Sequence, residues 1–199
     1  MSVLPAPPKT LKDRLLKTLE VNPSTLFRIS RFNSGEPFLG KSASNRFDDP
    51  LKKFGTCYLG HSLECAIAET VLHDLMPVKG QFHVPLEELE SRYLVQFEGA
   101  EKLTLVDLTG AHLKTLVGSS AISTVTPYDV PQKWARAIHN HPQKVDGIQF
   151  VSRQLNDQRA VVIFHRAKGK LQSPRYTPLL DAKGALAAIK LLHISVKYR

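Results

Sequence analysis

The chain has 199 residues, of which 42% are hydrophobic, and this fits one globular domain rather than a disordered chain. With 27 Lys and Arg against 18 Asp and Glu, its formal net charge is +9, which favours an anionic partner such as a nucleotide, a nucleic acid, an acidic protein or an acidic membrane. The two cysteines, Cys57 and Cys65, are too few for a disulfide framework and fit small core residues in a reducing compartment. No stretch has the apolar length of a signal peptide or a membrane-spanning helix, so we expect a cytoplasmic protein with no membrane partner.

The first 22 residues are expected to form an extension, followed by one main domain over residues 23–199. Residues 1–8 are rich in proline and indicate a loose segment. Over residues 9–19, leucines recur at helical spacing among basic residues, which predicts a short amphipathic helix. This helix has two alternative roles, docking on the main domain or lying on a membrane surface.

Strand-like segments outnumber helix-like ones from residue 25 onward, which predicts an α+β fold. The strands are expected over residues 25–30, 56–60, 81–86, 91–100, 103–108, 146–154 and 158–167. Helices are expected over residues 62–73, where Ser62 is the N-cap, and over 111–117, 127–139 and 182–192. Residues 33–55 form a long polar loop, and loops of this length often carry function.

Two charged residues in these elements are candidates for chemistry, and each has a plainer alternative. Glu69 falls on the flank of the apolar stripe of the helix expected over 62–73. It is therefore either a solvated helix glutamate or a carboxylate that points into a cleft. Arg28, between Phe27 and Ile29, needs an acceptor, which an internal carboxylate or a bound phosphate would supply. Arg31 lies close enough to compete for the same role.

Tyr58 and Arg46 are weaker candidates when each is taken alone. Tyr58 lies on the strand expected over 56–60 and fits a core tyrosine with its hydroxyl at the edge. Arg46 lies among lysines in the long loop, which could be an anion-binding cradle or simply a hydrated surface.

Several common site motifs are absent from the sequence. The histidines have neither an HExxH context nor cysteine partners, so we expect no metal site. There is no GxGxxG, no GxxxxGK[ST] and no GxSxG motif. The basic residues are dispersed and match no known nucleic-acid motif, so no direct nucleic-acid binding is expected.

Five short stretches taken in order carry a resemblance that no single residue supplies. They read LFRIS, SNRFDDP, CYLG, AIAE and GIQFVS, and the match that they mark spans about residues 25 to 166. In this order they resemble the RES domain, a family named for its arginine, glutamate and serine. The family's Gly-Gly-Arg-Trp-Asn loop departs here at Ser44, Asn45, Phe47 and Asp48, and its closing tyrosine is replaced by Phe150.

The resemblance implies an ADP-ribosyltransferase-like fold and an NAD⁺-consuming toxin of a bacterial toxin–antitoxin pair. It implies cleavage of the bond between nicotinamide and ribose, with Glu69 stabilising the oxocarbenium-like transition state. Arg28 would bind the NAD⁺ diphosphate, with Arg46 and Arg31 as further candidates. Tyr58 would stack on nicotinamide.

Ser152, the serine of GIQFVS, is expected either to bind the substrate or to orient Glu69 or Arg28. NAD⁺ would be the substrate, and no cofactor is expected. An Xre-like antitoxin is the expected partner, with any oligomer formed through the antitoxin complex. Three alternatives stay open: a transferase of ADP-ribose to a cellular protein, a basic nucleic-acid-binding module, and an inactive scaffold that binds a partner.

Overall fold

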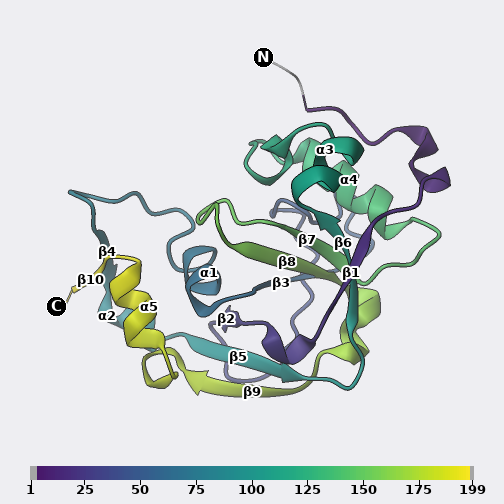
Figure 1. Cartoon of the computed structure of the whole chain (residues 1–199). Helices are drawn as coiled ribbons and strands as arrows, with labels where there is room; N and C mark the ends of the chain where they lie inside the picture. The colour runs from purple at the N-terminus through teal and green to yellow at the C-terminus, as the bar shows by residue number, and fades with distance from the viewer. Residues whose placement is uncertain (1–3, 198–199) are drawn as a thin grey trace.

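A computed structural model describes residues 4–197 (Figure 1), so the expectations that fall on residues 1–3 and 198–199 lie outside the described residues. The strands are β1 (Thr18–Val21), β2 (Arg28–Ser30), β3 (Thr56–Gly60), β4 (Phe82–Pro85), β5 (Tyr93–Glu98), β6 (Leu103–Leu108), β7 (Gly147–Val151), β8 (Arg159–Phe164), β9 (Gln172–Pro178) and β10 (Ile194–Lys197). The α-helices are α1 (Leu63–Ala68), α2 (Leu86–Glu90), α3 (Gly110–Leu116), α4 (Asp129–His139) and α5 (Ala185–Leu191). Short 3₁₀ helices are η1 (Lys9–Asp13), η2 (Pro23–Thr25), η3 (Ser120–Ser123), η4 (His165–Lys170) and η5 (Leu179–Asp181). The expected α+β fold is confirmed.

Two sheets form the centre of the molecule. The larger has five strands in the order β1-β6-β7-β8-β3, with β6 and β7 parallel and the other neighbours antiparallel. The smaller is antiparallel, in the order β2-β5-β9, and β10 pairs separately with β4. Strand β3 is therefore an edge strand of the larger sheet, and its outer side faces the start of β2.

Both faces of the larger sheet are buried, each against a different partner. Alternate residues of β3 and β8, such as Cys57 and Val161, pack in one cluster with Val95 and Phe97 of the smaller sheet. The opposite face packs with α3, α4 and the N-terminal segment around Trp134. A third cluster lies among α1, α5 and the β4–β10 pair, as Figure 1 shows to one side of the sheets.

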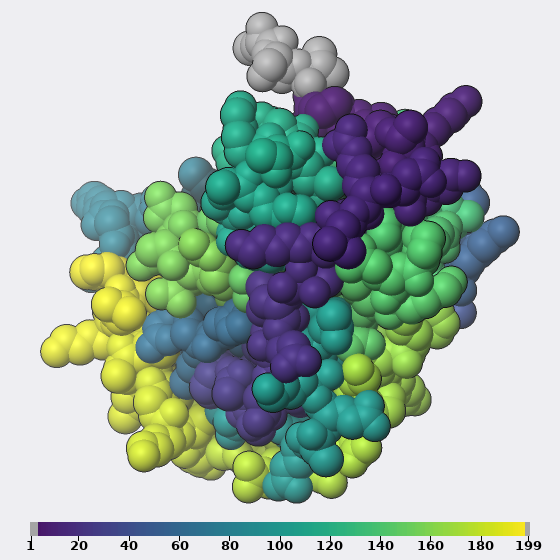
Figure 2. Space-filling model, turned by 45° about the vertical axis from the view of Figure 1, so that its right-hand side comes forward, coloured from purple at the N-terminus to yellow at the C-terminus, as the bar shows by residue number. Residues whose placement is uncertain are grey.

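The N-terminal segment docks on the main body, which was the first of its two expected roles. In Figure 2 it runs as a purple band over the surface. Leu11 and Leu16 are buried in the main core, and Trp134 Nε1 donates a hydrogen bond of 2.8 Å to the Pro5 carbonyl. The buried His141 ring lies within hydrogen-bond distance of the Leu11 and Arg14 carbonyls. None of the helices in residues 4–197 is long and apolar enough to cross a membrane.

Two of the expected helices are wrong in extent. The helix over 9–19 is only the 3₁₀ turn η1, and the chain then extends into β1, because pairing with β6 supplies hydrogen bonds that a short helix lacks. The helix over 62–73 begins at its Ser62 cap but ends at Ala68. There Thr70 N bonds to Ile67 O, an i→i−3 contact that tightens the last turn, and Thr70 Oγ1 bonds to the Ala66 carbonyl.

The remaining expectations hold with shifts at element ends, and several elements were not foreseen. β3 and β6 match the expected spans, whereas α4 and α5 begin later than expected. The elements α2, β9 and β10 were not predicted. β9 contains prolines, which lack an N–H, but it pairs only with β5 and lies at the sheet edge, where a missing N–H is tolerated.

His139 supplies a test of how this fold responds to acid. Its ring stacks on Phe54, with centroids 3.8 Å apart, and burial lowers its pKa to about 4. An unfolded histidine has a pKa of about 6.5, so between these values the unfolded chain binds a proton that the folded chain does not. The contribution of neutral His139 to stability is complete above about pH 6.5 and is lost as the pH falls toward 4.

We therefore expect His139→Phe, which keeps the stacking and removes the titration, to lose less stability than wild type when the pH drops from 7 to 5. Urea unfolding at both pH values measures this difference. Other histidines, including half-buried His61 and exposed His165, also have lowered pKa values and leave a residual slope in the variant. Equal losses in wild type and variant would contradict the assignment.

Candidate active site

A pocket of about 720 Å³ opens beside the edge strand β3. Residues from β2, the long loop over 31–55, β3, α1 and the hairpin between β7 and β8 line it. Six cationic side chains line the pocket against three carboxylates, those of Glu36, Glu69 and Asp74; the cations are Arg28, Arg31, Lys41, Arg46, Arg92 and Arg153. An excess of positive charge in a concave site favours an anionic ligand.

Glu69 is half-buried and lines this pocket, so it is not a freely solvated helix glutamate. Its position follows from the close packing of α1 on β3. At Gly60, a Cβ atom would lie 2.8 Å from the Ala66 amide nitrogen, so only glycine allows this approach. Because α1 ends at Ala68, Glu69 is its C-cap and its side chain reaches toward the hairpin that follows β7.

The hairpin after β7 holds one oxygen of the Glu69 carboxylate. Ser152 Oγ donates a hydrogen bond of 2.6 Å to Glu69 Oε1, and the Arg153 amide donates another of 2.9 Å to the same atom. Ser152 is 1% exposed, and its Oγ also accepts from the amides of Gln154 and Leu155. Within residues 4–197, no hydrogen bond reaches Glu69 Oε2. Ser152 was expected either to bind the substrate or to orient Glu69 or Arg28, and the structure shows its contact with Glu69.

Arg28 has an internal carboxylate as its acceptor. Its Nε donates to Glu36 Oε2 at 2.7 Å and its Nη1 to the Tyr58 carbonyl at 3.1 Å. Burial opposes the charge, but the Cys57 and Glu36 groups nearby outweigh it and raise the pKa of Arg28. The guanidinium lines the pocket, and in the described part of the chain its Nη2 makes no hydrogen bond. One donor of Arg28 is thus available to a ligand.

Tyr58 lines the pocket with its hydroxyl already engaged. The hydroxyl donates to Asp48 Oδ1 at 3.1 Å and accepts from the Phe47 amide at 2.9 Å. Burial and then the Asp48 carboxylate raise the pKa of the phenol well above its ordinary value, so it remains a donor. Asp48 also accepts from Thr56 Oγ1 at 2.6 Å, which ties the long loop to β3.

Arg46 is a residue of the long loop and is only 7% exposed, because it packs against the segment before α4. It is therefore not on a hydrated surface. Its Nη1 donates to the Val125 carbonyl at 2.6 Å, and its Cζ lies 4.6 Å from the centroid of the Tyr128 ring. Burial lowers its pKa, while the charges of Glu69 and the nearby aromatic hydroxyls oppose that effect. Arg46 and Glu69 both line the pocket.

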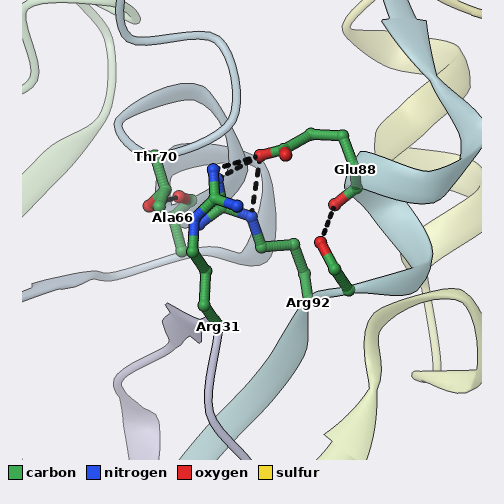
Figure 3. A network of polar contacts seen from close by, with 6 residues as sticks. Arg31, Ala66, Thr70, Glu88 and Arg92 are labelled. Atoms are coloured by element: carbon green, nitrogen blue, oxygen red, sulfur yellow. Dashed lines mark hydrogen bonds and ion pairs between the residues drawn. The ribbon is translucent and has the colours of Figure 1, made fainter.

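Arg31 is at the rim and already paired, as Figure 3 shows. Its Nη2 lies 2.9 Å from Glu88 Oε1, an atom that Arg92 also contacts. These two cations lower the pKa of Glu88 in spite of its partial burial. Arg31 is 57% exposed, so its side chain can move more freely than that of Arg28.

Sequence reasoning missed four pocket residues that the fold brings to the site. Glu36 is the buried partner of Arg28, and Arg153 lies next to the serine that holds Glu69. Phe32 and Phe38 line the pocket although they are 67% and 62% exposed. A weak signal was present, since phenylalanines in a largely polar loop need either a core or a ligand.

Cys57 and Cys65 are buried, as expected for core residues. Burial raises the pKa of Cys57 to about 11 and that of Cys65 to about 12, so neither is a thiolate at neutral pH. In the part of the chain that the structure describes, no three His, Cys, Asp or Glu side chains lie together as metal ligands.

Comparison with known proteins places this geometry in a family. The family model of the RES domain matches residues 25–183. A protein of Sinorhizobium fredii named "Probable toxin y4kH" is 30% identical over 111 residues, which cover 56% of this chain and 87% of that protein.

The fold is similar to that of a chain in the crystal structure of the Mycobacterium tuberculosis MbcT–MbcA toxin–antitoxin complex. The TM-score is 0.58 with 16% identity, over 88% of this chain and 91% of that chain. At this identity the likeness concerns the fold alone. The family match includes β2, the long loop, β3, Glu69 and Ser152, and on this ground the chain belongs to the RES-domain family.

Proposed function

We propose that this chain is the NAD⁺-consuming toxin of a bacterial toxin–antitoxin pair and that it hydrolyses the bond between nicotinamide and ribose. The observation that carries the proposal is the Glu69 carboxylate at the wall of a cationic pocket. Ser152 Oγ and the Arg153 amide fix its Oε1, whereas its Oε2 has no hydrogen bond within residues 4–197. One oxygen is thus held in place, and the other is left for a ligand.

The chemistry of the bond explains why one fixed carboxylate is sufficient. Nicotinamide leaves as a neutral molecule from a cationic ring, so its departure needs no acid. Positive charge grows on the ribose in the transition state, and a carboxylate beside the ribose stabilises that charge more than it stabilises the ground state. Glu69 Oε2 would accept a hydrogen bond from a ribose hydroxyl while water attacks the anomeric carbon, and the attacking water releases its proton to the solvent. A protein nucleophile in place of water would make the chain an ADP-ribosyltransferase.

The pocket cations suit the diphosphate of NAD⁺. Arg28 is held by Glu36 and offers its remaining donor, and guanidinium groups bind phosphate oxygens well. Arg46 is a second candidate that lines the pocket, and Arg31 is a third, more exposed one. Tyr58, fixed by its hydrogen bonds to the long loop, is the proposed surface for stacking of the nicotinamide ring.

The names of similar proteins support the biological part of the proposal. One relative is named a probable toxin, and a protein of similar fold was solved in complex with its antitoxin. We therefore propose an Xre-like antitoxin as the partner of this chain. An excess of cationic groups around the pocket would favour an acidic segment of that partner.

Glu69→Gln tests the proposal most directly. It removes the charge and preserves the shape, so we expect nicotinamide release from NAD⁺ by the purified protein to fall by roughly a hundredfold or more. Glu64→Gln is the matched control, because Glu64 lies on the same helix and does not line the pocket. It should keep wild-type turnover.

Expression in a bacterial host should arrest growth for wild type and Glu64→Gln and spare it for Glu69→Gln. Full turnover in a folded Glu69→Gln variant would overturn the proposed role of the carboxylate. If labelled ADP-ribose is transferred to a cellular protein and not to water, the chain is a transferase and not a hydrolase.

Ser152 is proposed as a positioning residue that acts through Glu69. Ser152→Ala removes the 2.6 Å hydrogen bond, and we expect kcat to fall about tenfold with little change in KM, because the carboxylate is less well fixed at the transition state. Thr70→Val is the control, since Thr70 also lines the pocket but bonds to the Ala66 carbonyl. A Ser152→Ala variant with raised KM and unchanged kcat would place the hydroxyl on the substrate instead.

A further inference from the structure

The outer edge of β3 arranges the pocket residues in a definite order. Two backbone bridges close this edge at its ends, Phe27 with Gly60 and Gly40 with Thr56, each through a pair of hydrogen bonds of 2.8–3.0 Å. Between them, the Tyr58 carbonyl accepts from Arg28 Nη1. Arg28 is therefore at the middle of a strand edge that spans about 13 Å from Thr56 to Gly60.

Glu69 lies at the Gly60 end of this edge. Gly60 pairs with Ala160 of β8, beside the turn of the β7–β8 hairpin where Val151 pairs with Arg159. Ser152, which holds Glu69, is the next residue of that hairpin. The proposed reaction therefore takes place at the Gly60 end.

Phe38 lies at the opposite end. It precedes Gly40, the residue bridged to Thr56, and its ring lies over that glycine, where a Cβ atom would be 3.4 Å from Phe38 Cε1. The ring is 62% exposed and lines the pocket. Removing a large apolar ring in a pocket from water is favourable, so an exposed ring here favours a ligand that covers it.

The backbone of Phe38 is tied to the same group that holds Arg28. Glu36 Oε2 accepts from the Phe38 amide and from Arg28 Nε, both at 2.7 Å. The Glu36 amide in turn donates to the Tyr176 hydroxyl of β9 at 2.8 Å. One buried carboxylate thus holds the backbone of Phe38 next to the Arg28 guanidinium.

We propose that Phe38 stacks on the adenine of NAD⁺ and so makes the enzyme selective for the dinucleotide; this inference rests on the proposed function. The order along β3 matches the order of groups in the substrate: the nicotinamide riboside at Glu69, the diphosphate at Arg28 and the adenosine at Phe38. Adenine has a flat face that a phenyl ring covers without a polar partner. Nicotinamide mononucleotide, which lacks the adenosine, does not reach this ring.

The test compares two substrates in Phe38→Leu and Phe38→Tyr. We expect Phe38→Leu to lower kcat/KM for NAD⁺ by about tenfold, through KM, and to leave kcat/KM for nicotinamide mononucleotide within about twofold of wild type. Phe38→Tyr, which keeps an aromatic face, should behave as wild type. Leu186→Ala is the control for loss of exposed apolar surface, because Leu186 lies on α5 outside the pocket.

An equal loss for both substrates, or no loss for either, would overturn the assignment of Phe38 to adenine. Wild type that releases no nicotinamide would contradict the proposed function rather than this inference. In that event, calorimetric binding of ADP-ribose decides the matter. Wild type should bind it about tenfold more tightly than Phe38→Leu, and equal affinities or no binding to either protein would refute the stacking.

Discussion

The edge of strand β3 must be covered, and this constraint arranges the whole candidate site. Exposed strand edges carry unpaired amide and carbonyl groups that need partners. Here the chain satisfies them with two short bridges, from Phe27 and Gly40, and with the Arg28 guanidinium between them. Because a side chain, and not a neighbouring strand, covers the middle of this edge, space is left for a pocket. The groove is thus a result of incomplete strand pairing at a place where the sheet could have continued.

The long loop supplies the second half of the site. Hydrogen bonds to carboxylates, together with apolar packing, hold this loop in one conformation. Asp48, which stands where the family has asparagine, accepts hydrogen bonds from Thr56, Tyr58, Ser42 and Asn45. The neighbouring Asp49 is bonded to Arg136 of α4, and its pKa is lowered because this contact and two backbone amides outweigh burial. Apart from Phe150, the departures from the family pattern thus fall in a loop with its own internal network of hydrogen bonds.

Sequence reasoning was most successful where the controlling interactions are local. Alternation and a serine cap were enough to place β3 and the start of α1, and the resemblance brought Glu69 and Ser152 into one site. Sequence reasoning failed where contacts between residues far apart in the sequence determine the local structure. The strand β1 forms because β6 is available, and Glu36 meets Arg28 through a loop without any periodicity. Spacing along the chain could not have revealed that Phe38 and Glu69 lie at opposite ends of one strand.

The early end of α1 gives Glu69 a particular electrostatic position. Glu69 is the C-cap of α1, the end of a helix at which a negative charge is unfavourable, and its carboxylate is held by Ser152 Oγ and the Arg153 amide of the hairpin after β7. Where positive charge develops on a bound sugar, the same arrangement becomes an advantage, because the carbonyl dipoles and the carboxylate act in the same direction. Under the proposed function, the site exchanges some conformational stability for stabilisation of the transition state, a compromise that is common where enzymes hold charges in place.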